Sequence, residues 1–300
     1  MIDLKTESYV HSKKLSFSQR FARLSGLQWL LLIIPLGFIL VLMFFSMMDF
    51  FKLSLFNENG FTLEYIQYVF TSEVYLRVLW LTIKIAFLVT LFSLIIAYPL
   101  AYSLVTSNSR IWKKIILGSV LIPFWISLLV RTFAWTILLR NNGVINIILM
   151  KLGIIDQPIE LIYNTTGVVI AMTHILLPYM VLSLYSVMSG IDLRLVQAAQ
   201  GMGARPWKAF MQVFFPLSIP GLLSGSLMVF VMGLGYFITP ALLGGSDTTM
   251  ISMLIDNNIS KTLNWHLASA LSLVLFVATI LLLAIAVLLT GKNPVLKELD

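Results

Sequence analysis

The chain has 300 residues, of which 59% are hydrophobic and only 11% are charged, and its mean hydropathy is +0.95. Because a soluble domain carries about 25% charged residues, this composition excludes an ordinary soluble protein and predicts a membrane protein. The absence of cysteine excludes disulfides, thiolate metal sites and cysteine nucleophiles, whereas the net charge of +7 raises the question of a nucleic-acid partner.

Six continuously apolar stretches are long enough to cross a bilayer as helices, which takes about 20 residues each. They cover residues 27–48, 76–105, 115–139, 167–189, 217–239 and 265–290. Their apolar residues run on without the alternation of an outer-membrane barrel. We therefore predict an all-α polytopic membrane protein with a transmembrane domain over residues 27–290.

The polar segments between these stretches predict the orientation. A basic tail, residues 1–26, precedes the first stretch, which lacks a small-residue cleavage site and is therefore expected to be a signal anchor. With this tail and the tail 291–300 inside, thirteen of the 20 Lys and Arg residues fall in cytoplasmic segments and four in outer segments. This bias predicts an N-in, C-in topology. It also accounts for the positive net charge, so no nucleic-acid partner is expected.

The outer segments contain one further apolar stretch and an excess of acids. The turn signal Asn141-Asn142-Gly143 is followed by an apolar run over 144–155. This run is too short to span, so we expect an interfacial or re-entrant helix. Eight acidic residues face four basic ones in the outer segments. The excess weakly favours a cationic solute or a basic patch on an outer partner.

The third to fifth stretches carry the residues that could line a path for a solute. Pro123 and Pro178 free backbone carbonyls, which is tolerated where protein or a water-filled cavity satisfies them. Arg131, which costs about 2.5–3.5 kcal/mol at the centre of a helix on insertion scales, is either a structural anchor or a group at a gate. His174 forms a helix–helix hydrogen bond, a polar cavity wall or a substrate contact. The aromatic residues near the prolines belong to packing, an interfacial belt or a substrate path. The substrate-path candidates are Trp125, Arg131, Trp135, His174, Tyr179, Tyr236 and Phe237.

Several motifs and residue types are missing from the sequence, and their absence excludes some classes of function. The sequence has no P-loop, no H-E-x-x-H motif and no G-x-S-x-G motif, so no catalytic, cofactor-binding or metal residue is assigned. No Asp or Glu falls within the six stretches. This disfavours an ion-coupled secondary carrier, which usually holds ionisable residues near the midplane, although His174 as a proton relay stays open.

The loop 190–216, here called the inner loop, is longer than a simple reversal requires. Asp192 is placed to cap a helix over 193–200, and Gly203 to reverse the chain at positive φ. Pro206 suits the first turn of a second short helix over 207–212. One face of the first helix carries Leu195, Ala198, Ala199 and Met202. Such a small-residue face favours docking of another protein over an amphipathic surface helix, whose apolar face is usually bulky.

The pattern Gln197-Ala198-Ala199-x-x-x-Gly203, followed by Phe215-Pro216, resembles the EAA loop of ABC-importer permeases. In that family this coupling loop seats in a groove of the cytoplasmic ATPase. Gln197 replaces the usual Glu, which removes a charge that could contact the ATPase, and Phe215 replaces the usual Leu. The resemblance implies an ATPase-coupling set of Gln197, Ala198, Ala199, Met202, Gly203 and Arg205.

Five further segments are similar to the spermidine/putrescine permease subgroup, specifically its first permease subunit. They are Ile122-Pro123-Phe124-Trp125, Leu129 to Trp135, Asn142 to Asn146, Ile175 to Met180 and Gly235 to Gly245. The resemblance covers roughly residues 60–290 and leaves out the basic tail. It implies the type I ABC-importer permease fold in the bacterial inner membrane.

The resemblance implies a transport subunit and no enzyme. This subunit would form the path for a small cationic solute, a polyamine, and would couple to a separate ATPase through residues 191–212. The implied partners are a second homologous permease, an ATP-binding subunit dimer that holds ATP and Mg, and a periplasmic solute-binding protein. The alternatives are a permease for ferric iron, thiamine, sulfate or another small solute, and an ion-coupled secondary carrier.

Overall fold

The computed structural model describes residues 26–57 and 60–290, so the predicted tails 1–26 and 291–300 lie outside it except for Gly26. The chain divides into two units, residues 1–50 and 51–300. The first unit contributes nearly all of α2 (Gly26–Lys52), an apolar helix that contains Pro35. Its described side chains between residues 33 and 48 are almost all exposed. A helix that is apolar all round is expected for a membrane span.

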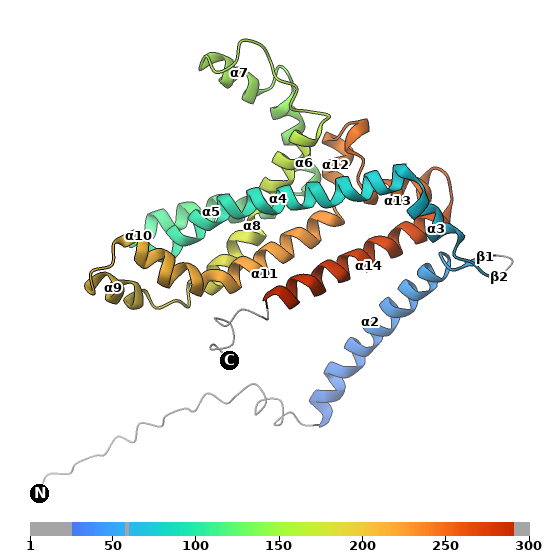
Figure 1. Cartoon of the computed structure of the whole chain (residues 1–300), viewed down its shortest axis with the longest axis horizontal. Helices are drawn as coiled ribbons and strands as arrows, with labels where there is room; N and C mark the ends of the chain where they lie inside the picture. The colour runs from blue at the N-terminus through green and yellow to red at the C-terminus, as the bar shows by residue number, and fades with distance from the viewer. Residues whose placement is uncertain (1–25, 58–59, 291–300) are drawn as a thin grey trace, which may run out of the picture. The chain divides into compact units, whose positions relative to one another are not determined.

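The second unit is built around three helices, α4 (Glu73–Thr106), α8 (Thr165–Met188) and α11 (Phe215–Leu234) (Figure 1). Small residues bring α11 close to its neighbours. A Cβ on Gly221 would lie 2.9 Å from Val187 Cβ, and a Cβ on Gly233 would lie 3.2 Å from Ala86 Cβ. Gly221 and Gly225, which are four residues apart, thus pack against α8, as small residues do between membrane helices.

The third apolar stretch does not form the single helix expected over 115–139. It divides into α5 (Arg110–Trp125) and α6 (Leu128–Leu139), with extended backbone at Ile126. Pro123 lacks the N–H that would bond to Ser119 O, and Ile126 N–H closes the last turn by bonding to Pro123 O at 3.2 Å. The expected short helix that follows is α7 (Val144–Lys151). Figure 1 shows that α6 and α7 leave the direction shared by α4 and α11.

Six helical stretches are long and apolar enough to cross a membrane. Five correspond to expected spans, and the third covers residues 128–151 in place of 115–139. The last is α14 (Trp265–Thr290). It packs against the outer helices α3 (Glu64–Thr71) and α13 (Ile251–Ser260). Each predicted crossing therefore has a matching apolar helical stretch, and the third stretch is shared by α6 and α7 across the turn at residues 140–143.

Short elements fill the outer segments. Strands β1 (Phe56–Asn57) and β2 (Gly60–Phe61) pair antiparallel, with Phe56 opposite Phe61. The helix α12 (Ile238–Leu243) and the 3-10 turn η2 (Ser246–Thr248) precede α13. The fifth span therefore ends at Leu234 and does not reach residue 239, because Gly235 interrupts it before α12 begins.

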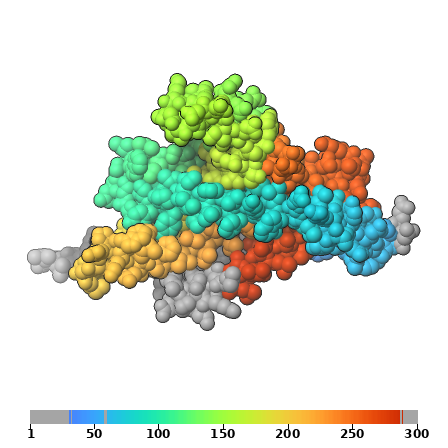
Figure 2. Space-filling view, turned by 45° about the horizontal axis from the view of Figure 1, so that its top comes forward, coloured from blue at the N-terminus to red at the C-terminus, as the bar shows by residue number. Residues whose placement is uncertain are grey.

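The inner loop forms α9 (Leu193–Gly201), α10 (Pro206–Ala209) and the π-helical turn η1 (Phe210–Phe214). The helix then runs on into α11, so the expected separation between a short helix over 207–212 and a span that begins at 217 is wrong. A proline in the first turn of α11 follows the wider π turn, where its missing N–H is accommodated without a break. In Figure 2 the α9 and α10 segment, in gold, projects at one end of this unit.

Candidate functional site

The inner loop has the local geometry that its sequence predicts. The Asp192 carboxylate accepts a hydrogen bond from Arg194 N–H at 2.9 Å and caps α9. At the other end Gly203 adopts φ +92°. Gly203 N–H bonds to Gln200 O at 2.9 Å and Ala204 N–H bonds to Ala199 O at 3.1 Å. This pair of bonds is a Schellman motif, which needs a residue in the left-handed region and therefore favours glycine.

One side of α9 is uncovered by the rest of the second unit. Leu195 is 51% exposed and Met202 is 84% exposed, and Gln197 and Ala198 are exposed beside them. Leu193 and Val196 instead pack toward the core. The coupling candidates Gln197, Ala198, Met202, Gly203 and Arg205 thus reach the surface, whereas Ala199 is half-buried.

A column of aromatic rings joins the inner loop to α4. Phe210 in the π turn stacks on Trp207 at a centroid distance of 5.7 Å and meets Tyr102 edge-on at 5.3 Å. Tyr98 adds a hydrogen bond between its hydroxyl and Ser218 Oγ at 2.8 Å. The column consists of Tyr98, Tyr102, Trp207, Phe210, Phe214 and Phe215. Sequence reasoning missed this contact, although the aromatic spacing before Pro216 was a signal for it.

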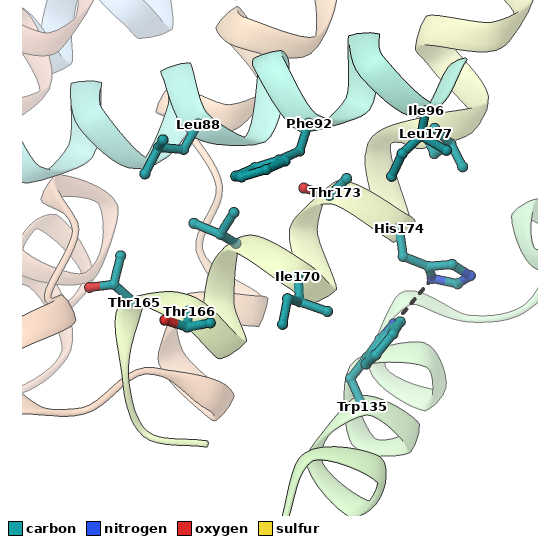
Figure 3. A pocket seen from close by; sticks show the side chains of 11 residues that line it. Leu88, Phe92, Ile96, Trp135, Thr165, Thr166, Ile170, Thr173, His174 and Leu177 are labelled. Carbon is teal, nitrogen blue, oxygen red and sulfur yellow. Dashed lines mark hydrogen bonds between the residues drawn. The ribbon is translucent and has the colours of Figure 1, made fainter. Parts of the chain in front are cut away.

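Two of the substrate-path candidates are joined directly (Figure 3). Trp135 Nε1–H of α6 donates a hydrogen bond to His174 Nδ1 of α8 at 3.1 Å. Because Nδ1 accepts this bond, the imidazole is neutral with its proton on Nε2. Protonation of Nδ1 would break the bond, which disfavours His174 as a proton relay and favours its role in joining two helices.

The other candidates surround the gap between α5 and α6. Arg131 lies close enough to His174 and Tyr236 to interact electrostatically with both. Tyr179 meets Phe124 edge-on at 5.4 Å. Trp125, at the end of α5, is 89% exposed and lies outside these contacts. Phe237 is 37% exposed at the start of α12 and has no ring contact among the described residues. We call Phe124, Arg131, Trp135, His174, Tyr179 and Tyr236 the break cluster.

Trp135 and His174 also line a cavity of about 600 Å³ between α4 and α8 (Figure 3). The α4 wall is made of Leu88, Phe92 and Ile96. The Thr173 hydroxyl, on the α8 wall, has no hydrogen-bond partner among the described residues. A cavity with carbon on most of its walls suits hydrocarbon better than a polyamine, whose ammonium groups need polar partners.

A second cavity of about 600 Å³ lies on the outer segment and has more polar groups in its lining than the first. Its lining consists of Arg140, Asn141, Asn142, Glu160, Ile162, Tyr163 and Asn164. Tyr163 is held at φ +62° while its N–H bonds to Leu243 O at 2.8 Å. Asn146 joins both walls by bonding Arg140 O and the backbone of Ile159. Sequence reasoning missed this cavity. Within residues 26–57 and 60–290 no three potential metal ligands come together.

Comparisons with known proteins agree with this architecture. The spermidine/putrescine transport system permease protein PotB of Haemophilus influenzae is 31% identical over 212 residues, which cover 71% of this chain and 74% of PotB. A bacterial ABC transporter that imports the acidic polysaccharide alginate superposes with a TM-score of 0.72 at 17% identity, covering 89% of this chain and 96% of that chain. The same kind of transporter, bound to a periplasmic protein that carries an alginate pentasaccharide, gives 0.70 at 19% identity, covering 86% and 92%.

The family model for binding-protein-dependent transport system inner membrane components matches residues 97–291. The match includes the inner loop, the break cluster, the outer cavity and the first cavity except its α4 wall, which is Leu88, Phe92 and Ile96. The fold is that of ABC-importer permeases, with six helices that cross the inner membrane. The chain is therefore a transport subunit, and it belongs to the family of binding-protein-dependent transport system inner membrane components.

Proposed function

We propose that this permease carries a small cationic solute, most specifically a polyamine, and is driven by a separate ATPase that docks on the inner loop. Residues 191–212 act as the lever. Closure of an ATPase dimer moves this lever, and the membrane helices change from inward-facing to outward-facing. The ATP and Mg belong to the ATPase, and this chain supplies the path.

The observation that carries the coupling proposal is the exposed face of α9, ended by Gly203 at φ +92°. Small and polar side chains there let another protein approach the helix backbone closely. The aromatic column then gives the lever a packed connection to α4. A loop that only reversed the chain would need neither feature.

Replacement of Gly203 by valine tests this coupling. A β-branched residue at positive φ is strained, so the Schellman end of α9 should be lost. We expect ATP-driven uptake in proteoliposomes to fall at least tenfold while the spans still insert. Gly201→Ala is the matched control, because Gly201 is helical and a Cβ there meets nothing within 4 Å. Unchanged ATP-driven uptake by the Gly203→Val variant would show that residues 191–212 do not act as the lever.

The polyamine proposal is supported by the similarity to PotB and by the acidic excess of the outer segments. The aromatic rings of the break cluster add faces that attract ammonium groups. Ferric iron, thiamine, sulfate and other small solutes are the alternatives. The proposed partners are a second homologous permease, two ATPase copies and a periplasmic solute-binding protein.

The reconstituted complex distinguishes these solutes. We expect a binding protein loaded with putrescine or spermidine to stimulate the ATPase. The same complex is measured with sulfate-loaded and ferric-iron-loaded proteins. Stimulation by either of these, with none by a polyamine, would reject the polyamine and keep the permease assignment.

A further inference from the structure

The first cavity, between α4 and α8, has the length of one membrane leaflet. Figure 3 shows Thr165 and Leu177 at opposite ends of its α8 wall, and this distance is about 18 Å along a helix. Half of the hydrocarbon core of a bilayer is about 15 Å thick. In the predicted topology Thr165 lies at the outer end of α8. The cavity therefore begins at the outer surface and extends through the outer leaflet.

The walls of the first cavity suit an apolar chain that enters from the side. Phe92 and Ile96, on the α4 wall, are 45% and 44% exposed, so the cavity is open along this wall. The unpartnered Thr173 hydroxyl does not require a polar occupant. Thr90 bonds to the carbonyl four residues before it, and rotation of the Thr173 side chain offers it the same bond to Val169 O.

The outer cavity lies at the outer ends of two helices that also border the first cavity. Trp135 of α6 bonds to α8 inside the membrane, and a Cβ on Gly167 of α8 would lie 3.5 Å from Leu139 Cδ1 of α6. The two helices thus run side by side to their outer ends. Arg140, which follows α6, and Asn164, which caps α8, line the outer cavity. The outer cavity is therefore next to the outer end of the first.

The outer cavity has one side chain of each charge in its lining, Arg140 and Glu160. Neither side chain forms an ion pair or a hydrogen bond with another described residue. The bonds of Asn146 to Arg140 O and to the backbone of Ile159 hold the two walls together. A rigid cavity with a free cation and a free anion suits a zwitterion. Arg140 repels a polyamine, whose charged groups are all positive.

We propose that the two cavities bind one phospholipid of the outer leaflet, with an acyl chain in the first cavity and an ethanolamine head group in the outer cavity. The phosphate accepts hydrogen bonds from Arg140 and the ammonium donates to Glu160, and both bonds are charge-assisted. A membrane helix of another chain would continue through both leaflets, whereas this cavity ends after one. The bound lipid fills the space between α4, α6 and α8, so it stabilises the position of α6.

Native mass spectrometry of the assembled transporter, extracted in mild detergent, tests the apolar part of the site. The wild type should retain phosphatidylethanolamine in preference to phosphatidylglycerol. Ile170→Trp fills the first cavity and should lower the retained lipid severalfold. Leu88→Phe is a smaller filler that serves where the tryptophan prevents assembly. Ile95→Trp is the matched control, because Ile95 is 58% exposed on α4 and does not line the cavity.

Two charge variants test the head-group contacts by the same measurement. Arg140→Gln should lower the retention of both phospholipids severalfold, while the backbone bonds of residue 140 stay in place. Glu160→Gln should remove the preference for phosphatidylethanolamine, because phosphatidylglycerol has no ammonium group. Lys151→Gln is the matched control, since Lys151 is exposed in the same outer segment and lies outside the cavity.

Four results would overturn the proposal. Wild-type retention of lipid by both Ile170→Trp and Leu88→Phe would show that the first cavity holds no chain. Equal retention of the two phospholipids by the wild type would reject the ethanolamine head group. A benzoylphenylalanine photo-crosslinker at Ile96 that reaches only protein would show that another chain covers this face. Displacement of the lipid by spermidine would place the cavity on the solute path.

These measurements need no transport. Stimulation of the wild-type ATPase by a polyamine-loaded binding protein tests the proposed function separately.

Discussion

The Asn146 side chain is fully buried in an outer segment and bonds only to backbone. Its Nδ2 donates to Arg140 O at 3.2 Å and to Ile159 O at 3.0 Å, and its Oδ1 accepts from Ile159 N–H at 2.9 Å. Since a buried amide must find partners, these bonds hold residues 140 and 159 in a fixed relation. They thereby set the position of both walls of the outer cavity.

Asn146→Ala should loosen this outer segment. It leaves the Ile159 N–H and carbonyl without their partner, whereas Arg140 O keeps its bond from Gly143 N–H, and each buried unsatisfied group costs about 1–3 kcal/mol. We expect faster amide hydrogen exchange over residues 140–164, with Ile159 affected most, and unchanged exchange in the middle of α8. Asn141→Ala is the control, because Asn141 is exposed. Equal exchange in the two variants would contradict the role given to Asn146.

The sequence predicts single residues well where their partners are local. Asp192 as a cap, Gly203 at positive φ and Pro206 at a helix start each depend on neighbours within a few positions, and all three are found. Asn146 and Tyr163 could not be assigned, because their partners Ile159 and Leu243 are 13 and 80 residues away along the chain. Arg131 was noticed for its charge, but its lack of a partner is visible only in three dimensions.

At the level of elements, the π turn η1 joins the inner loop to α11 without an interruption. A π turn inside a helix is rare and is frequent at functional sites. Phe210 in this turn touches rings on both sides, Trp207 in the loop and Tyr102 in α4. The Phe210 ring therefore connects the inner loop to the spanning helix α4.

Phe210→Ala should weaken coupling more than assembly. Each aromatic contact is worth about 0.5–1.5 kcal/mol beyond its buried area, and this ring makes several. We expect less solute transported per ATP hydrolysed, measured in proteoliposomes, with the complex still purified intact. Phe210→Tyr keeps the ring and should behave as the wild type. A normal ratio of transport to hydrolysis in the alanine variant would show that the column only packs.

Gly221→Ala should destabilise the contact of α8 with α11. The added methyl would lie 2.9 Å from Val187 Cβ and 3.4 Å from Leu184 Cα, and neither atom can move freely. Overpacking of this kind costs about 1–3 kcal/mol, so the Tm of the purified complex should fall. Gly118→Ala is the control, because its methyl would meet only Ile122 Cδ1, at 3.8 Å. An unchanged Tm for Gly221→Ala would mean that the two helices separate easily.

Prolines show why helix breaks resist prediction. Pro99 and Pro178 lie inside continuous helices, whereas α5 ends two residues after Pro123. All three remove the same N–H. Whether the helix continues depends on the packing around it, and α4 and α8 are enclosed by each other while the end of α5 is exposed. That difference is absent from the local sequence.

At the level of the whole molecule, the lack of native cysteine allows the topology to be tested one position at a time. Asn142→Cys lies in the outer segment, and Asn108→Cys and Gln200→Cys lie in the two inner loops, all at exposed positions. We expect a membrane-impermeant maleimide to label position 142 in intact cells. Positions 108 and 200 should react only after permeabilisation. Labelling of positions 108 and 200, but not of position 142, in intact cells would show the opposite orientation of the chain in the membrane.

The continuous apolar runs predict the number of crossings, and the inner-loop motif predicts the family. Both are local signals in the sequence. Hydropathy places the third crossing at 115–139, but the structure has an apolar stretch at 128–151 that α6 and α7 share. This difference follows from the break at residues 126–127. The direction that α6 takes depends on its contacts with α12, including Thr132 Oγ1 to Thr239 Oγ1 at 3.3 Å, which are distant in sequence.

The π turn also determines how the chain responds to the deletion of a single residue. One residue of an α-helix turns the chain by about 100°, so the extra residue of η1 sets the angular phase between the inner loop and α11. Loss of one residue within 210–214 would restore an ordinary helix and rotate α9 about the axis of α11. Substitutions in α9 leave that phase unchanged. We therefore expect the deletion of one residue from 210–214 to disturb the inner loop more than a single substitution on the exposed side of α9.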